Sequence, residues 1–267
     1  MKAVPLVVLS LGFALSLHAD FREDKVISAR VDESGVEQTS GCVHVHFDAN
    51  VLTSEQRSGF AELADKGAMA IASFTGIDEP AHIDVYVVRD DLVSHTFPHW
   101  PASRDHNPRV FLAAGRVEHH RAPYLHELVH AVVGDGGAVW LEEGYASYVA
   151  SEVSTHYGGY YAPVLSRGND RVDAQAAAII RRESPDQLAK ELEWIRGDTE
   201  PSFAHDEERT SFYILSHSFT KFLAERLGLK TLTAIHRRND IEELARRTGK
   251  TSSAWRQEWV RKLSDES

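Results

Sequence analysis

The sequence predicts an α+β fold, with its strands in the first half of the chain and helices throughout the second. Two observations carry this prediction. Alternating apolar and polar residues, which are typical of half-buried strands, recur only before about residue 115. After Tyr124 nearly every segment has helical periodicity, and the breaks between segments are short and contain glycine. We therefore expect one domain at 41–263, with an α+β part at about 41–133 and a helical part at about 134–263.

The composition is that of a globular protein with an acidic charge balance. The 267 residues are 42% hydrophobic and 26% charged. A net charge of −11 argues against nucleic acid as a partner, because phosphates would be repelled. The single cysteine, Cys42, cannot form an intramolecular disulfide or a thiolate zinc site. Any metal would therefore have to be held by nitrogen and oxygen, and the chain has 15 histidines.

Residues 1–19 have the pattern of a secretory signal peptide. An apolar run follows a basic start at Lys2, and Ala19 is a small residue suited to cleavage. The run is shorter than the ~20 apolar residues of a spanning helix and has no basic flank after it, so an uncleaved anchor is the less favoured alternative. We expect a secreted or periplasmic mature chain without a membrane span. In it, residues 20–40 are expected to form a mobile leader or a short edge strand.

The strands are predicted from apolar residues that recur at every second position. The predicted strands are residues 41–47, 82–88 and 109–115. In the first, the alternation places His44 and His46 on one face. Two histidines so spaced can grip a metal, although a solvated strand face is the simpler interpretation.

The helices are predicted from apolar residues repeating at intervals of three and four. Thr53 or Ser54 is expected to cap the first, which runs to about Phe74 and is ended by Gly76. Helices in the second half are expected at residues 123–133, 139–152, 171–182, 185–196, 208–227, 230–237, 240–247 and 251–263.

The sequence HELVH at residues 126–130 is the first signal of chemistry. On a helix, His126 and His130 lie one turn apart on the same face, so both imidazoles can reach one ion while Glu127 projects beside it. This spacing suits zinc, and a catalytic zinc takes three protein ligands and one water. Because histidine is frequent in this chain, the motif alone can arise by chance. A third ligand must come from elsewhere.

The third ligand is predicted on the next helix, which reads WLEEGYASY at residues 140–148. A glycine-rich turn allows this helix to return past the first, so that Glu143 can face the two histidines. Glu142 is the competing candidate. The two glutamates lie about 100° apart round the helix, so both cannot point at one ion. Glu143 is favoured because Leu141 and Tyr145 flank the side expected to be buried.

These motifs resemble those of the gluzincin metallopeptidases. In that family an HExxH helix is followed by a helix carrying a glutamate immediately before a glycine, as in HELVH and WLEEGYA here. The segment YILSHSFTKFLAERLG at 213–228 resembles a further gluzincin helix, which begins with tyrosine and ends at Leu-Gly. The resemblance covers about residues 105–230. It implies a zincin-like α+β fold, with a small mixed sheet and helices, a C-terminal helical subdomain and an active-site cleft between them.

The resemblance also implies a mechanism. His126, His130 and Glu143 would hold one Zn2+, which activates a water for attack on a peptide bond, with Glu127 as general base. In the aminopeptidase branch the tyrosine hydrogen-bonds the tetrahedral intermediate, so Tyr213 takes that role here. His217 lies one turn later on the same face. It is a second candidate donor, although a surface or core histidine is the simpler interpretation.

The departures from the family pattern narrow the activity. The strand at 109–116, RVFLAAGR, lacks the acid with which aminopeptidases recognise a free amine, so an endopeptidase is favoured. Metzincins are excluded because Gly136 stands where their third histidine would be. Thermolysin-like enzymes usually have an aspartate shortly after the glutamate ligand, whereas Ala146 and Ser147 stand here. The groups that support the ligands must therefore differ.

The sequence thus predicts a secreted zinc metallopeptidase acting on peptides or proteins. The strand at 109–115 is expected to line the cleft, because gluzincins bind an extended substrate along the edge of their sheet. The loop carrying His95, His99 and His106 is a candidate cleft wall, and its irregular pattern disfavours a second metal site. The alternative is a catalytically silent zinc-binding module of the same fold, used for binding or scaffolding. Retention of Glu127 argues against that alternative.

Overall fold

The computed structural model describes most of the chain after residue 22. The described residues are 23–78, 80–92, 94–97, 107–134, 138–161, 166–183, 185–194, 203, 205–238 and 242–265. The predicted signal peptide at 1–19 lies outside them. None of the helices within these ranges combines the length and the apolar character needed to cross a membrane.

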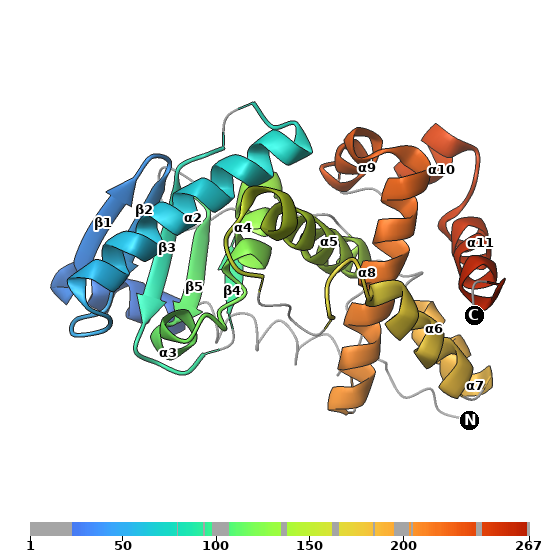
Figure 1. The fold of residues 1–267 in the computed structure, drawn as a ribbon, viewed down its shortest axis with the longest axis horizontal. Coiled ribbons are helices and arrows are strands. Elements are labelled where there is room, and N and C mark those ends of the chain that lie inside the picture. The colour runs from blue at the N-terminus through green and yellow to red at the C-terminus, as the bar shows by residue number, and fades with distance from the viewer. Residues whose placement is uncertain are drawn as a thin grey trace, which may run out of the picture.

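Five strands in the described part of the chain form one mixed sheet (Figure 1). They are β1 (Val36–Ser40), β2 (Val43–Phe47), β3 (Ile83–Val88), β4 (His95–Phe97) and β5 (Arg109–Ala113). Their order across the sheet is β1-β2-β3-β5-β4, with β2, β3 and β5 parallel and the two outer strands antiparallel to their neighbours. The three predicted strands are confirmed. The third ends earlier than expected, at Ala113, because the chain turns directly into a short helix.

The nine helices predicted from the sequence are found in the predicted order, and the short helix α3 is an addition to them. They are α2 (Ser54–Thr75), α3 (Ala114–Glu118), α4 (Tyr124–Val133), α5 (Val139–Tyr157), α6 (Val172–Arg182), α7 (Pro185–Trp194), α8 (Asp206–Leu227), α9 (Leu229–His236), α10 (Glu242–Thr248) and α11 (Ser252–Asp265). The α+β fold class is therefore confirmed. The largest difference in bounds is at α5, which continues to Tyr157 and ends only where Gly158 adopts a φ of 91°.

Helix α2 shows how local sequence sets a boundary. The Thr53 hydroxyl accepts a hydrogen bond from the backbone N–H of Gln56 (3.2 Å), and the Gln56 side chain accepts one from the backbone N–H of Thr53 (2.8 Å). This reciprocal arrangement makes Thr53, rather than Ser54, the residue that caps the helix. Gly76 ends it in the left-handed conformation (φ 74°), which glycine adopts without steric cost.

One face of the sheet builds the main core. Val45, Val85 and Leu112 are buried on this face, against α2 and α4. The same cluster of buried apolar side chains continues through α5 and α8 to Trp259 on α11. The sheet and the C-terminal helices therefore share one core, which fixes α4 and α5 between them.

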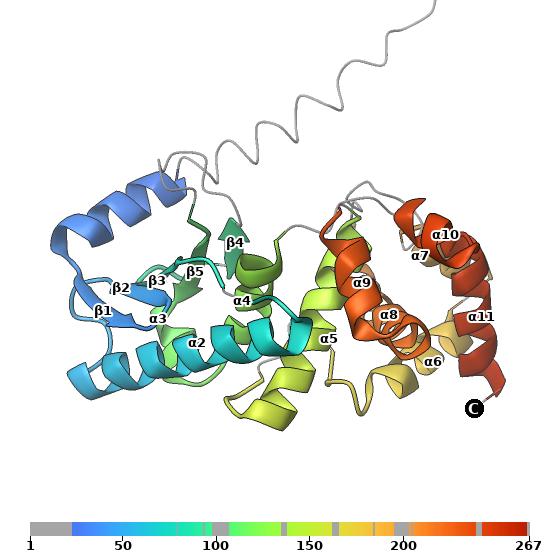
Figure 2. The ribbon, with the colours of Figure 1, turned by 90° about the horizontal axis from the view of Figure 1, so that it is seen from above.

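The opposite face of the sheet is covered by a further helix at residues 23–34, here called the outer helix (Figure 2). Its Ile27 and Val31 pack with Tyr86 and Phe111 in a second, smaller cluster. The expectation of a mobile leader at 20–40 is therefore wrong over this stretch, although the alternative of an edge strand is confirmed by β1. The helix escaped prediction because only two apolar residues, one turn apart, form its buried stripe.

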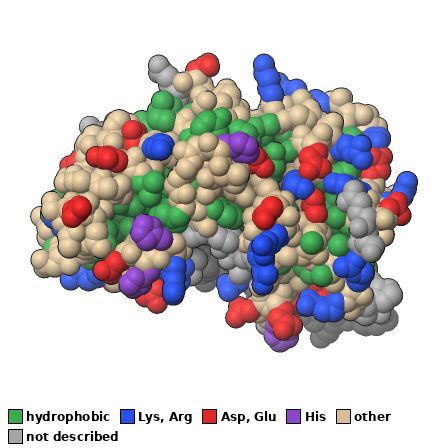
Figure 3. All heavy atoms as spheres, in the orientation of Figure 1, with side chains coloured by type: hydrophobic (Ala, Val, Ile, Leu, Met, Phe, Trp, Pro, Cys, Tyr) green, Lys and Arg blue, Asp and Glu red, His purple; other side chains and the backbone are tan. Residues whose placement is uncertain are grey.

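Helix α8 is the centre of the C-terminal half. It contacts α5, α6, α7, α9 and α11. On the face of the molecule in Figure 3, charged side chains of both signs are interspersed over these helices. Ion pairs link neighbouring helices to α8: Lys190 of α7 pairs with Glu208, and Lys262 of α11 pairs with Glu225.

A buried aspartate at the end of β2 ties the outer helix to the sheet and gives a stability prediction. Asp48 is fully buried and pairs with Arg89 and Arg30, each at 2.6 Å. The hydrogen bond from Arg89 outweighs burial and lowers the pKa of Asp48 from 3.8 to about 2. Because the folded pKa is depressed, the stabilisation is present above about pH 4 and is lost as the pH falls towards 2.

We therefore expect Asp48→Asn to lower the free energy of unfolding by about 1–2 kcal/mol at pH 7, since the arginines are partly exposed to solvent. Urea denaturation of both proteins at pH 7 and pH 3 measures this difference, which should narrow at the lower pH. If the two proteins differ in free energy of unfolding by the same amount at pH 7 and pH 3, the lowered pKa does not belong to Asp48.

Candidate metal centre

Helix α4 carries the HELVH motif into the core. All ten of its residues are buried, because it lies between the sheet, α2 and α5. His126 and His130 are one turn apart, and their Nε2 atoms are 3.2 Å from each other. The helical spacing predicted from the sequence thus brings two imidazole nitrogens to one point.

Helix α5 supplies the third donor. Glu143 Oε2 lies 3.1 Å from His126 Nε2 and 4.0 Å from His130 Nε2. The ligand atoms of the three residues all lie within 4.8 Å of one another, and they form a candidate metal-binding group. Glu143 therefore occupies the position expected for it relative to the two histidines.

The separations of these atoms suit a four-coordinate metal ion. Bonds of about 2.0–2.1 Å in tetrahedral geometry place neighbouring ligand atoms about 3.3 Å apart. Two of the three separations are 3.2 and 3.1 Å, and the third, between His130 and Glu143, is 4.0 Å. Two imidazoles and one carboxylate are also the donor types that zinc and related divalent ions prefer. The residues present therefore fit such an ion.

The second ring nitrogen of each histidine has its own neighbour. Ser147 Oγ lies 3.4 Å from His126 Nδ1, and Glu142 Oε1 lies 3.6 Å from His130 Nδ1. Glu142 is thus next to the ligand cluster but on the far side of the His130 ring. Contacts of this kind orient ligand imidazoles. The serine and the neighbouring glutamate supply them where thermolysin-like enzymes would use an aspartate.

Two of the three donors have pKa values that suit metal binding, whereas for His126 burial is outweighed by the hydrogen bond with Glu143, which raises its pKa. Burial opposes ionisation of Glu143, but its hydrogen bond with His126 and the two imidazoles outweigh this and lower its pKa. Burial is the main reason that the pKa of His130 falls to about 4. At neutral pH the site therefore presents a carboxylate beside an uncharged His130, whose ring nitrogen has a lone pair to offer.

Glu127 projects into the site from the same helix but is not one of the three converging donors. It is only 5% exposed, and burial raises its pKa. The Thr96 hydroxyl lies 2.9 Å from Glu127 Oε2 and 3.0 Å from the Glu127 main-chain oxygen. Thr96 belongs to β4 and was not predicted from the sequence, which carries no local signal linking it to Glu127.

The two candidates on α8, Tyr213 and His217, lie in different environments. Tyr213 borders the cleft, and its hydrogen bond to Glu143 helps to lower the pKa of that carboxyl group. His217 is fully buried, with Nδ1 2.6 Å from Ser166 Oγ and Nε2 2.5 Å from Asn169 Oδ1. Burial lowers the pKa of His217 to about 3. Both of its ring nitrogens are engaged, so the interpretation of His217 as a core residue is confirmed.

The site opens into a cleft of about 930 Å³. Its lining includes the three ligand candidates, Glu127, Tyr213, all three residues of β4, and Glu23, Asp24 and Ile27 of the outer helix. The expectation that the strand at 109–115 lines the cleft is wrong, because β4 lies outside β5 in the sheet and borders the cleft instead.

The histidine-bearing loop is only partly described. His95 lies on β4, lines the cleft and sits 2.9 Å from Asp24 Oδ2. It thereby joins the edge strand to the outer helix, which makes it part of a cleft wall. His99 and His106 lie outside the described residues.

Gly144 explains why a glycine follows Glu143. Helix α8 passes so close that an added Cβ would overlap the main-chain oxygen of Ser216 and the hydroxyl of Thr220. We expect Gly144→Ala to cost about 1–3 kcal/mol of stability and to displace Glu143. Chemical denaturation measures the loss, with Gly59→Ala as the control, since nothing lies within 4 Å of a Cβ at that helical position. Equal effects of the two substitutions would contradict this account of the close approach.

Comparison of the chain with protein-family models, curated proteins and solved structures finds no match. The function is therefore inferred from the geometry of the site. That geometry brings His126, Glu127, His130, Glu143 and Tyr213 to the same cleft.

Proposed function

We propose that the protein is a zinc-dependent metallopeptidase of the gluzincin type, with a zincin-like fold and a secreted or periplasmic location. The observation that carries the proposal is the convergence of His126, His130 and Glu143 beside the Glu127 carboxylate in an open cleft. Structural zinc sites are usually closed by a fourth protein ligand, whereas catalytic sites keep one position for water. Three converging donors at a cleft fit the catalytic kind.

Zinc bound by these three residues would supply a Lewis acid that acidifies a water molecule and polarises a carbonyl oxygen. Glu127 accepts a proton from the attacking water and returns it to the leaving nitrogen, so it acts first as base and then as acid. Thr96 holds the Glu127 carboxylate by a hydrogen bond to Oε2, which fixes the direction in which the other oxygen points. The raised pKa of Glu127 suits a group that must both take up and release a proton.

The substrate class follows from the cleft. Its border is β4, the outermost described strand on that side of the sheet, and an extended peptide can pair with such a strand through its main chain. Main-chain pairing binds peptides of many sequences. Because such pairing does not require a free amino terminus, it favours an endopeptidase over an aminopeptidase.

Tyr213 is assigned to stabilise the oxyanion, because it lies at the cleft beside Glu143. We expect Tyr213→Phe to lower kcat by about 100-fold, the effect of losing one oxyanion donor. Steady-state kinetics on a cleaved peptide measures the change, with zinc content determined in parallel because Tyr213 also contacts a ligand. A variant with full zinc content and unchanged kcat would show that Tyr213 is only a packed aromatic.

The proposal is tested by zinc removal and restoration. An unbiased peptide library is incubated with protein holding zinc at this centre, with protein stripped by a chelator, and with stripped protein to which zinc has been returned. We expect new peptide termini in the first and third samples only. Zinc-loaded protein that cleaves nothing would contradict the proposal and favour a zinc-binding module without turnover.

A further inference from the structure

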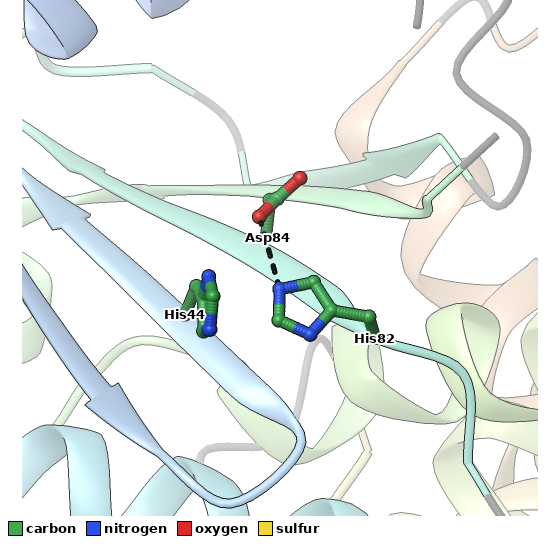
Figure 4. Close-up of side chains that lie close together, drawn as sticks. All are labelled: His44, His82 and Asp84. Carbon is green, nitrogen blue, oxygen red and sulfur yellow. Dashed lines mark ion pairs between the residues drawn. The ribbon is translucent and has the colours of Figure 1, made fainter. Parts of the chain in front are cut away.

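A second group of metal-type donors lies on the sheet, among elements that do not contribute to the cleft. It consists of His44 on β2, His82 just before β3, and Asp84 on β3 (Figure 4). His44 and Asp84 are direct partners in the parallel pairing of β2 with β3. His82 is two residues before Asp84, so its side chain points to the same face. The backbone of the sheet therefore fixes the relative positions of all three donors.

The three side chains converge closely. His82 Nε2 is 3.7 Å from Asp84 Oδ1, and the rings of His44 and His82 are 3.7 Å apart at an angle of 89°. One donor atom from each residue lies within 4.8 Å of the others, as at the centre on α4. The geometry therefore places three donor atoms where one ion can contact all of them.

We propose that His44, His82 and Asp84 form a second binding site for a divalent transition-metal ion of the zinc class. Two imidazoles and one carboxylate favour such an ion over magnesium or calcium, which take oxygen ligands. The side chains of His44, His82 and Asp84 are 30%, 34% and 15% exposed, so an ion can enter from solvent. Three protein ligands leave at least one position to water.

Neighbouring groups support this arrangement. Glu37 Oε1 on β1 lies 3.4 Å from His44 Nδ1, and His46 Nε2 lies 3.4 Å from Asp84 Oδ1. Carboxylates that contact ligand histidines orient the ring and raise its basicity. His46 is thus a neighbour of the site and not one of its donors. The histidine that joins His44 is His82, which immediately precedes β3.

A bound ion would join β2 to the residues that lead into β3. These strands are connected through the long helix α2, so the ion would hold together segments that are distant in sequence. Binding to the folded state alone stabilises it by mass action. The site is therefore expected to raise thermal stability in zinc independently of any activity at the cleft.

The test is the number of zinc ions bound per chain, measured by equilibrium dialysis against buffered Zn2+ followed by metal analysis. We expect two in the wild type, one in His44→Ala/His82→Ala and one in His126→Ala/His130→Ala. His156→Ala is the matched control, because His156 also contacts a carboxylate, Glu152 (3.4 Å), but belongs to neither donor group. It should bind two.

The outcomes separate this site from the proposed catalytic centre. Wild-type zinc content in His44→Ala/His82→Ala would overturn the second site and leave the peptidase proposal intact. Loss of one zinc there, with none lost in His126→Ala/His130→Ala, would support the second site and contradict the first. Circular dichroism in metal-free buffer checks folding. If the double variant is unfolded, Asp84→Asn replaces it, and unchanged zinc binding by a folded Asp84→Asn protein would overturn the inference.

Discussion

Replacing His130 by alanine is expected to weaken zinc binding at the cleft by more than about 100-fold and to abolish peptide hydrolysis. The estimate is a lower bound, because loss of a supporting contact alone costs about 10- to 100-fold in affinity. Helix α4 holds His130 one turn from His126, and the Nε2 atoms of the two residues are 3.2 Å apart. Among the described residues, His126 and His130 are the only imidazoles of this donor group.

Competition with a zinc chelator of known affinity measures the change for His130→Ala in the background of His44→Ala/His82→Ala, so that the second proposed site cannot take up the zinc. His156→Ala serves as the control, since this histidine is well exposed on α5 and is not among the donors. If a folded protein with His130→Ala holds zinc as tightly as the protein without this substitution, the ion is held elsewhere.

Replacing Glu127 by glutamine is expected to lower kcat by about 10²- to 10⁴-fold, the usual contribution of a general acid–base group. Glutamine keeps the shape and can still accept a hydrogen bond from Thr96, but it cannot take the proton of water. Zinc affinity should stay close to that of the wild type, because Glu127 is not one of the converging donors.

Steady-state kinetics on the best-cleaved library peptide measures this loss, alongside the zinc competition assay. Glu118→Gln, an exposed glutamate on α3, is the control for loss of one negative charge. If Glu127→Gln keeps more than a tenth of the wild-type kcat, Glu127 is not the base. If it loses zinc, the carboxylate acts as a ligand instead.

The helical elements could be predicted because their signals are local. The bounds of α4 and α8 follow from apolar periodicity, and the i, i+4 spacing of His126 and His130 requires only a helix. The choice of Glu143 over Glu142 followed from their angular separation, from Leu141 and Tyr145 flanking the side expected to be buried, and from the resemblance to a known motif. The structure then gave Glu142 a place beside His130, which no local pattern indicates.

Contacts between distant segments could not be predicted in this way. Thr96 reaches Glu127 because a three-residue strand pairs beside β5, and nothing in the sequence around it marks that strand. The wrong prediction that residues 109–115 line the cleft has the same cause, because the order of β4 and β5 in the sheet depends on strand pairing. The donor group of His44, His82 and Asp84 likewise requires the register between two parallel strands.

If the cleft holds a zinc ion and hydrolyses peptide bonds through Glu127, the decisive measurement compares bound zinc and new peptide termini for two proteins. These are His44→Ala/His82→Ala and the same protein with Glu127→Gln added. We expect one zinc per chain in both proteins and cleavage of the peptide library only by the protein that keeps Glu127. One zinc in both, with no cleavage by either or equal cleavage by both, would show that the cleft does not hydrolyse peptide bonds through Glu127.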